Sequence, residues 1–435
     1  MSDSSKQQHA PLKRQVGLWG AVFMGLGAMV GTGVFVSIGI AAGLAGPAVI
    51  LAVALAAVVA ACNGLSSAQL AAAHPVSGGT YEYGYQYLTP RLGFTAGWMF
   101  LIAKSASAAT AALGAAWYIA DLARRFDLPW RPGLELAIGI VVALTSIVLL
   151  GIRRSNTVNI CIVAITLIAL VTFVAAGLPI VADNWQTRLT PFFPGGWSGT
   201  FHATALMFVA YTGYGRIATL GEEVREPGKT IPRAVITTMI VTAVLYGCVA
   251  TIIAMAIEPE DWGMAGGLSF IAPMNDVSGY VLLMVVGAVT AMLGVLLNLI
   301  LGLSRVLLAM GRRRDMPSVF ARVSLKDHSP TWSVAGVGVI VLSITLIGDI
   351  KLAWSFSAFT VLVYYSITNL AALKMPDELR RYPRWVAVFG LAACLFLAFQ
   401  VDARTWQIGL GLILVGLGWH TVARGRRLAE RGKAD

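Results

Sequence analysis

The residues best placed to do chemistry in this 435-residue chain are two glycine-containing interruptions of long apolar segments. Gly31-Thr32-Gly33 interrupts the first apolar segment, and Tyr211-Thr212-Gly213-Tyr214-Gly215 interrupts the sixth. Each interruption frees backbone N–H and C=O groups at membrane depth, where only protein or a water-filled cavity can satisfy them. Two broken apolar segments in the two halves of a chain are typical of a secondary transporter's binding site.

The freed groups at such a break suit a ligand that carries both charges. The half-helix that restarts near Val34 directs N–H groups and a positive dipole end into the gap, which favours a carboxylate. The half-helix that ends near Val30 offers carbonyls to an ammonium group or a cation. We therefore expect a zwitterion such as an amino acid. The alternative interpretation is that the glycines only allow close helix packing.

Composition requires a membrane around most of the chain. The sequence is 57% hydrophobic and 12% charged, with a mean hydropathy of +0.75, whereas a soluble domain has about 25% charged residues. We expect an all-α integral membrane protein, because about 20 apolar residues cross the roughly 30 Å of hydrocarbon. Twelve apolar segments are candidates: 17–45, 47–73, 93–123, 134–151, 157–182, 199–223, 231–257, 278–310, 331–350, 352–373, 384–401 and 405–424.

The distribution of basic residues predicts the orientation. If the N-terminus is cytoplasmic, the cytoplasmic loops and tails hold about four times as many Lys and Arg residues as the opposite side. This bias predicts that both termini lie inside and that the protein resides in the cytoplasmic (inner) membrane. The net charge of +11 is then a topology signal and not a sign of nucleic-acid binding.

Four motifs, in chain order, resemble those of the amino acid–polyamine–organocation superfamily. They are Gly31-Thr32-Gly33-Val34-Phe35, His74-Pro75-Val76-Ser77-Gly78-Gly79-Thr80-Tyr81, Phe208-Val209-Ala210-Tyr211-Thr212-Gly213-Tyr214, and Glu222-Glu223-Val224 to Pro227 followed by Ile231-Pro232-Arg233-Ala234. The resemblance implies two inverted five-helix repeats, residues 17–182 and 199–373, with discontinuous helices 1 and 6. Two further helices (384–424) and cytoplasmic tails (1–16 and 425–435) complete the implied organisation. The implied mechanism is alternating access around a site at the middle of the membrane.

The same resemblance assigns substrate contacts. It implies that the substrate carboxylate meets backbone amides near Thr32, Gly33 and Val34. The amino group would meet carbonyls near Ala28 or Met29 and near Phe208 and Ala210. Tyr211 and Tyr214, on either side of Gly213, would be gate or pocket aromatics, although Tyr214 could equally be an interfacial or core tyrosine.

Two positions bear on the substrate's side chain. Val209 stands where some relatives carry a large aromatic residue, which leaves more volume. Gly215 stands where some cationic permeases carry Asp or Glu, so a cationic substrate would lack its partner. We therefore favour a neutral amino acid, with an amine, polyamine or cationic amino acid as the alternative.

Two basic residues, Lys104 and Arg216, are assigned to the membrane-spanning segments and not to the loops. Lys104 is about eleven residues into the third span, where a lysine costs at least ~2.5 kcal/mol and must face a cavity or a partner. It is either a proton-binding or substrate-orienting lysine, or a structural lysine bonded to carbonyls freed by a broken helix. Arg216 lies near the cytoplasmic end of the sixth span, where it can reach the interface or pair with Glu222 or Glu223 as a gate.

The residues expected to couple transport to protons or sodium differ from the family pattern. Proton-coupled relatives often carry a lysine in the fifth span, and alignment from Gly151 places Thr166 there. A sodium site would have too few oxygen ligands, so we hypothesise that Lys104 replaces the missing charge; otherwise the protein exchanges substrates. A membrane enzyme is disfavoured because paired acids or histidines within the spans are absent from the sequence, whereas a non-transporting sensor stays open. We expect no cofactor or metal, lipid as a partner, and a monomer or homodimer.

Overall fold

The computed structural model describes residues 16–75, 78–130, 133–150, 156–218, 224–256, 278–324 and 330–431. All regular elements in these ranges are helices, with one isolated bridge between Val16 and Val224. The N-terminal residues before 16, Gly151, the predicted gate residues Glu222 and Glu223, and the last four residues lie outside the described ranges. The elements are α1 (Leu18–Met29), η1 (Gly33–Ser37), α2 (Ile38–Ala45), η2 (Gly46–Ala48), α3 (Val49–Ala73), α4 (Thr80–Tyr87), α5 (Pro90–Arg125), α6 (Leu134–Leu149), α7 (Asn156–Asn184), α8 (Gly196–Tyr211), α9 (Tyr214–Ala218), α10 (Pro227–Ala256), α11 (Ser278–Arg312), η5 (Ser318–Ala321), α12 (Thr331–Thr345), α13 (Ile350–Lys374), η6 (Asp377–Leu379), α14 (Arg384–Ala398) and α15 (Ala403–Arg431).

Many of these helices are long and apolar enough to cross a membrane. Within the described ranges, seven helical stretches meet that requirement, and α6, α12 and α14 are shorter apolar helices. The first stretch runs from Leu18 to Ala73 and joins two predicted spans. The predicted span 199–223 is the short pair α8 and α9. The chain is therefore a multi-pass helical membrane protein, and the number of twelve spans stays a prediction.

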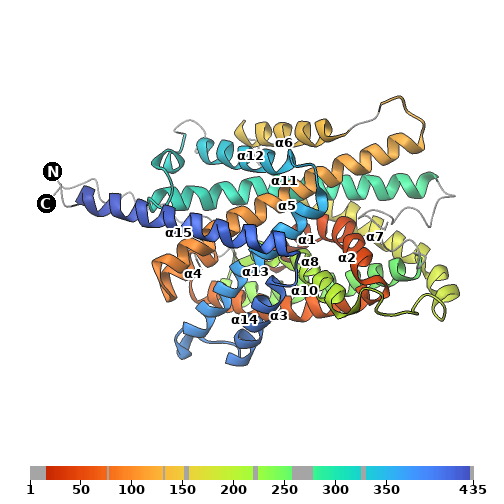
Figure 1. Ribbon diagram of the computed structural model, residues 1–435, viewed down its shortest axis with the longest axis horizontal. Helices are drawn as coiled ribbons and strands as arrows, with labels where there is room; N and C mark the ends of the chain where they lie inside the picture. The colour runs from red at the N-terminus through yellow and green to blue at the C-terminus, as the bar shows by residue number, and fades with distance from the viewer. Residues whose placement is uncertain are drawn as a thin grey trace.

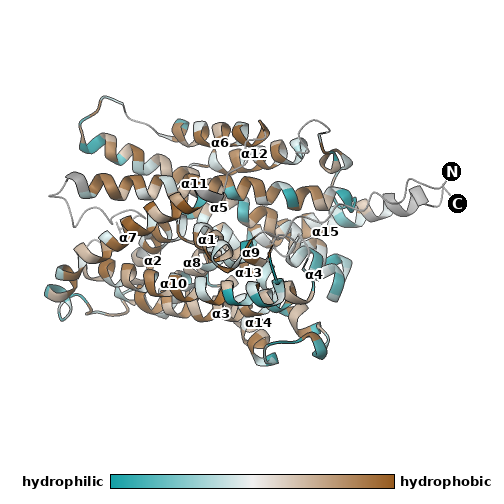
Figure 2. Ribbon diagram, turned by 180° about the vertical axis from the view of Figure 1, so that it is seen from behind, coloured by the Kyte–Doolittle hydropathy of each residue, from teal (hydrophilic) through white to brown (hydrophobic). Residues whose placement is uncertain are grey.

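The broken helices lie inside the bundle. In Figure 1, α1 and α8 occupy the middle, α3, α10 and α14 lie below them, and α5 and α11 run above them. The view from behind shows α9 beside α1 at the centre of the bundle (Figure 2). Helices α6 and α12 pack against each other along one edge. The interruptions are therefore enclosed by continuous helices, as freed backbone groups require.

Both expected interruptions are present in the structure. Helix α1 ends at Met29, Val30 is extended (φ −79°, ψ 90°), and the chain resumes as the π-helical turn η1 before α2. Helix α8 ends at Tyr211, and Thr212 and Gly213 form a turn before α9 begins at Tyr214. A π-helical turn is a common feature of functional sites.

The two interruptions pack directly on each other through their glycines. A side-chain carbon added to Gly33 would lie 2.7 Å from Ala210 Cβ, and one added to Gly213 would lie 2.6 Å from the carbonyl carbon of Ala28. Any larger residue would force the two backbones apart. The glycines therefore do allow close packing, as the alternative interpretation held, and this packing also places both breaks at one point.

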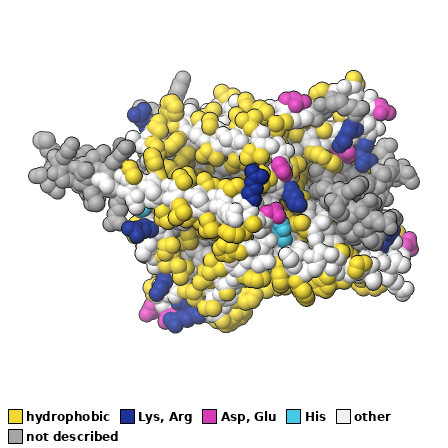
Figure 3. Space-filling model, viewed as in Figure 1, with side chains coloured by type: hydrophobic (Ala, Val, Ile, Leu, Met, Phe, Trp, Pro, Cys, Tyr) yellow, Lys and Arg dark blue, Asp and Glu magenta, His cyan; other side chains and the backbone are white. Residues whose placement is uncertain are grey.

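The surface agrees with a lipid environment. The face shown in Figure 3 carries mostly hydrophobic side chains, and the charged side chains form small separate groups. Large apolar residues are exposed on several helices; examples are Ile240, Val244 and Leu414, at 60%, 63% and 70%. Exposed apolar surface of this extent in a soluble protein would mark an interaction site, so lipid contact explains it here.

Candidate binding site at the helix interruptions

Tyrosines from neighbouring helices satisfy carbonyls that the interruptions leave free. Tyr246 Oη, on α10, donates to Met29 O at 2.7 Å, directly at the end of α1. Tyr365 Oη, on α13, donates to Thr212 O at 3.3 Å in the second interruption. Because a buried carbonyl without a donor is destabilising, these hydroxyls stabilise the broken geometry. Sequence reasoning missed both residues, since tyrosines within apolar segments also occur as core residues.

The amino end of the restarted helix carries an unsatisfied polar group. The N–H groups of Val34 and Phe35 both donate to Gly31 O at 3.1 Å, so the predicted Val34 amide already has an acceptor within the chain. The amides that precede it open a helical turn and have no earlier helical carbonyl to bond. Thr32 Oγ1 is buried and, within the described part of the chain, has no hydrogen-bond partner. The Thr32 hydroxyl is thus a group at this break that can form a hydrogen bond with a ligand.

Two connected cavities lie at the interruptions. The smaller has a volume of about 30 Å³ and the larger about 110 Å³. Both are lined by Ala28, Lys104, Thr212, Val295 and Leu299. The smaller is also lined by Met29, Thr32, Gly33, Ser107, Val209, Ala210 and Trp354. The larger is also lined by Gly78, Phe100, Gly213, Gly215, Arg216, Asn298, Gly302, Leu303, Arg305 and Val306. Lys104 and Thr212 therefore lie between the smaller cavity and the larger one, which we call the vestibule.

Most of the predicted site residues line these cavities, and a minority do not. Ala28, Met29, Thr32, Gly33, Val209, Ala210, Gly213, Lys104 and Arg216 line one or both. Val34 instead lines a separate apolar pocket of about 10 Å³ with Phe35 and Tyr118.

The remaining predicted residues pack within the protein. Phe208 and Tyr214 lie against the ring of Tyr365, with centroids 5.6 and 5.3 Å away. Tyr211 Oη donates to Val53 O at 3.4 Å. Thr166 Oγ1 donates to Ile162 O of its own helix at 2.7 Å. In the described cavities none of these four is a lining residue, so their side chains reach the site only through neighbours.

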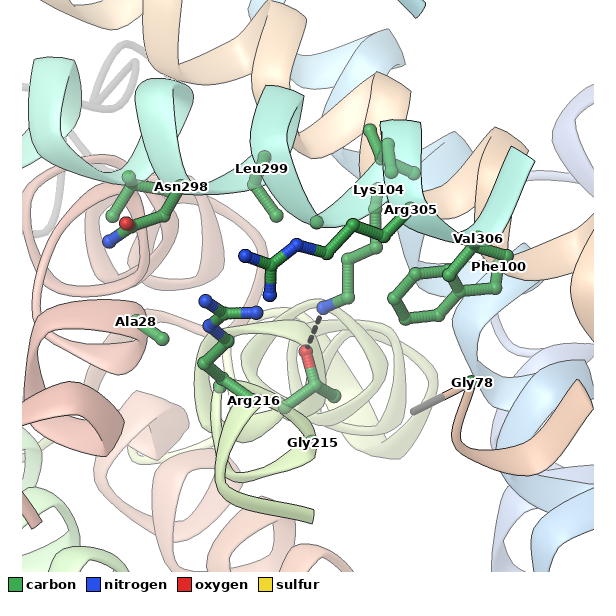
Figure 4. Close-up of a pocket in the computed structure, with 15 residues that line it drawn as sticks. Ala28, Gly78, Phe100, Lys104, Gly215, Arg216, Asn298, Leu299, Arg305 and Val306 are labelled. Carbon is green, nitrogen blue, oxygen red and sulfur yellow. Dashed lines mark hydrogen bonds between the residues drawn. The ribbon is translucent and has the colours of Figure 1, made fainter. Parts of the chain in front are cut away.

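Lys104 bridges the third predicted span and the second interruption. Its side chain is buried, and its Nζ donates to Thr212 Oγ1 at 2.7 Å (Figure 4). Thr212 Oγ1 in turn donates to Val209 O at 2.7 Å, and this carbonyl also accepts from the Thr212 N–H at 3.1 Å. Lys104 is therefore linked to the broken helix through the Thr212 hydroxyl, and not through a direct hydrogen bond to a backbone carbonyl.

Two arginines face the same space as Lys104. Figure 4 shows the head groups of Lys104, Arg216 and Arg305 directed into the larger cavity from α5, α9 and α11. Arg216 was predicted from the sequence, and its proposed partners Glu222 and Glu223 are outside the described residues. Arg305 was missed, because it is near the end of the segment 278–310 and was counted with the cytoplasmic charges. Its position inside that apolar segment was the available signal.

The groups at the site can bind a polar solute. Hydroxyls, carbonyls, an amine and guanidinium groups surround the cavities. Among the described residues, no group of three or more His, Cys, Asp or Glu side chains could hold a metal ion.

The fold and the site together define a class of protein: a multi-pass helical membrane protein whose paired helix interruptions line internal cavities that contain both polar and apolar groups. The sequence profile of the family described as amino acid permease matches residues 16–407. The chain therefore belongs to the amino acid permease family of the amino acid–polyamine–organocation superfamily.

Similar proteins agree on transport and differ in substrate. A transporter of Mycobacterium tuberculosis, named as uncharacterised, is 38% identical over 95% of this chain and 92% of its own length. The branched-chain amino acid permease of Bacillus subtilis is 28% identical over 93% of this chain and 92% of its own. The methylthioribose transporter of the same organism is 26% identical over 95% and 94%. The match indicates a transporter and not an enzyme. Because the relatives differ in substrate, the substrate of this chain must be inferred from the residues of its site.

Proposed function

We propose that this protein is a secondary active transporter that moves an amino acid without a positively charged side chain across the cytoplasmic membrane by alternating access. The observation that carries the proposal is the direct packing of the two interruptions around cavities that both breaks line. The proposal includes twelve spans, inverted repeats at residues 17–182 and 199–373, two further helices at 384–424, and cytoplasmic termini. The basic-residue bias and the family pattern support these features.

The proposed binding mode uses both ends of the broken helices. The substrate carboxylate would bind the amides near Thr32 and Gly33 and the Thr32 hydroxyl, which is buried without a partner. The ammonium group would bind carbonyls near Ala28 and Ala210. Met29 O and Thr212 O are less available, because Tyr246 and Tyr365 already donate to them. Tyr246 Oη also lies 3.4 Å from Ala210 O, and because its contact with Met29 O is shorter, at 2.7 Å, Ala210 O is the more available of these two carbonyls.

Among the described residues that line the site none carries a carboxylate, so the proposal does not include a substrate with a cationic side chain. Gly215 lines the larger cavity where an acid would be needed, and all fifteen described lining residues of that cavity are neutral or basic. An amine or polyamine would also leave the amides near Thr32 without an anion. The neutral amino acid favoured by the sequence argument meets both conditions.

Coupling is assigned to Lys104 as a hypothesis. Its amine lies at the junction of the two cavities and bonds the second interruption. A change in its protonation would therefore act on the element that must move in alternating access. If transport proves independent of a proton gradient, the proposed mode becomes exchange.

The test is uptake of a panel of labelled amino acids by proteoliposomes that contain the purified protein, with and without a pH gradient. We expect saturable uptake of non-cationic amino acids, and competition by amino acids but not by the matching amines. Counterflow separates a transporter from a sensor that binds without moving its ligand. Binding without uptake or counterflow would contradict the proposed transport.

A further inference from the structure

The polar side chains of the smaller cavity differ in how much hydrogen-bonding capacity they offer a ligand. Among the described residues, the polar ones that line it are Thr32, Lys104, Ser107, Thr212 and Trp354. Thr212 Oγ1 already donates to a carbonyl of α8 and accepts from Lys104 Nζ, both at 2.7 Å. Thr32 belongs to the proposed carboxylate site. Lys104, Ser107 and Trp354 are therefore the polar groups to examine for a substrate's side chain.

Trp354 is a wall of the cavity whose donor is already used. Its Nε1 donates to Ser37 Oγ at 3.0 Å and lies 3.1 Å from Leu206 O, so the indole is tied to η1 and to α8. Because an indole has a single N–H and accepts no hydrogen bond, Trp354 offers a ligand its ring surface. These two contacts also hold the ring in place, which limits the space beside it.

The hydroxyl of Ser107 is oriented by a serine on α13. Ser357 Oγ donates to Ala103 O at 2.9 Å, and Ser107 Oγ lies 2.8 Å from Ser357 Oγ. A hydroxyl has one proton, and a carbonyl can only accept. Both contacts form together only if Ser107 donates to Ser357. The proton of Ser107 is then directed toward α13, and its oxygen offers a ligand an acceptor.

Lys104 places a donor on the same face of α5. Residues three apart in a helix lie on one face, and Lys104 and Ser107 both line the smaller cavity. An ammonium group has three N–H donors, and one of them bonds Thr212 Oγ1. This face of α5 therefore presents an N–H donor and a hydroxyl acceptor to the same space.

We propose that the substrate is a small amino acid with a hydroxyl side chain, such as serine, and that Ser107 and Lys104 bind that hydroxyl. The inference rests on the proposed function and specifies its substrate class. The α-amino and α-carboxylate groups bind at the interruptions. The side-chain O–H donates to Ser107 Oγ, and its oxygen accepts from Lys104 Nζ.

The chemistry of this face favours a hydroxyl over other neutral side chains. An aliphatic side chain would displace water from the Ser107 oxygen and the Lys104 amine without replacing its hydrogen bonds, which is destabilising. A carboxamide also donates and accepts, but it is larger. The cavity has a volume of about 30 Å³, and the ring of Trp354 is held by its two contacts. A hydroxymethyl group is the smallest side chain that fills both roles.

The first experiment compares two substrates of nearly equal size in proteoliposomes that contain the purified protein. L-Serine and L-2-aminobutyrate differ in that a hydroxyl replaces a methyl group. We expect the KM for L-serine to be lower by about threefold or more, the net effect of about one hydrogen bond. A smaller difference, or the opposite preference, would overturn this inference and leave the proposed function standing. Absence of uptake and counterflow for every amino acid would overturn both.

The second experiment assigns the preference to Ser107. Ser107→Ala removes the acceptor, so the ratio of the KM for L-2-aminobutyrate to the KM for L-serine should fall to about one. The matched control is Ser105→Ala, because Ser105 is a buried serine of the same helix that lines neither cavity. It should keep the ratio of the wild type. An unchanged ratio in Ser107→Ala, or an equal fall in Ser105→Ala, would overturn the inference.

A third variant tests the direction of the Ser107 proton. Ser357→Ala removes the group to which Ser107 donates, so the Ser107 hydroxyl becomes free to turn its proton into the cavity. The preference for L-serine should then weaken, but by less than in Ser107→Ala. A ratio of KM values identical to that of the wild type would overturn the assignment of Ser107 as an acceptor.

Thermal stabilisation gives a readout that requires neither transport nor a variant that folds. The rise in Tm of the purified wild-type protein should be larger with L-serine than with the same concentration of L-2-aminobutyrate, because a ligand stabilises in proportion to its affinity for the folded state. A rise of equal size with both compounds would contradict the inference.

Discussion

Two polar regions of this molecule differ in how their charges are balanced. At the C-terminal end of α11, Arg313 bonds Glu82 and lies over the ring of Tyr85 at 4.5 Å. Asp315, fully buried, accepts from Tyr81 and Tyr85 at 2.7 and 2.6 Å. At the vestibule, by contrast, the described lining carries three basic residues and no acid. The first region forms its network among its own side chains, whereas the second lines a cavity in which the proposed function places the substrate.

The electrostatics of the first region follow from its internal partners. Burial opposes the charge of Arg313, but the hydrogen bond and the ionic contact with Glu82 outweigh it and raise the pKa of Arg313 above its usual value. Burial, followed by the neighbouring Asp315, raises the pKa of Tyr81. Both groups therefore keep one protonation state over the physiological range, which is typical of a structural network. A network of this kind gives no opportunity for an outside ligand.

The largest expected effect comes from separating the two interruptions. Gly33→Val and Gly213→Val place side-chain atoms within 2.7 Å of the opposing segment, and we expect both to abolish uptake. Because the contact is with protein atoms, Tm should fall as well. The control is Gly247→Val on α10, where an added carbon meets no atom within 4 Å. Uptake retained in either glycine variant would contradict the placement of the site.

A smaller but still large effect is expected at Lys104. Lys104→Gln and Lys104→Ala remove the amine that bonds Thr212, and uptake should fall about tenfold or more, the loss of a hydrogen bond to a charged group. The pH dependence of uptake, measured between pH 5 and 8, should also disappear in both variants. Arg216 and Arg305, the other charged groups at the cavity, are unchanged in this test. An unaltered pH profile would remove Lys104 from coupling.

The sequence could predict the interruptions because their signal is local. Glycine and polar residues within an apolar segment predict a helix break without any knowledge of tertiary contacts. Both breaks occur where expected. Val34 was assigned as an amide donor for the same local reason, but its N–H bonds Gly31 O, because a π-helical turn follows. Local sequence does not distinguish that turn from an α-helical start.

Contacts between distant helices were harder to predict. Alignment from Gly151 placed Thr166 toward the first break, yet Asn159 is the α7 side chain that donates to α1, at 3.2 Å from Phe23 O. The alternating tyrosines at 81–87 have the period of a strand, yet the structure forms helix α4 there. Helix rotation and neighbours decide these contacts, and neither is visible in residue types alone.

A moderate effect is expected from the hydroxyl that caps α1. Tyr246→Phe leaves Met29 O without its 2.7 Å donor, and an unsatisfied buried carbonyl destabilises by about 1–3 kcal/mol. We expect a lower Tm and a severalfold rise in KM, because the break loses its fixed geometry. The matched variant is Tyr211→Phe, whose hydrogen bond to Val53 O is longer, at 3.4 Å. A larger Tm loss in Tyr211→Phe would weaken the role given to Tyr246.

The smallest effect is expected in the network of Arg313, Glu82 and Asp315. It therefore tests directly whether this region and the cavity differ in function. Arg313→Gln removes an ion pair with Glu82 in which the arginine side chain is 42% exposed, and such pairs contribute about 0–1 kcal/mol. Uptake should stay unchanged within about twofold, whereas Lys104→Gln should lower it about tenfold or more. A loss of uptake in Arg313→Gln as large as that in Lys104→Gln would mean that charge at the end of α11, and not contact within the cavities, governs transport.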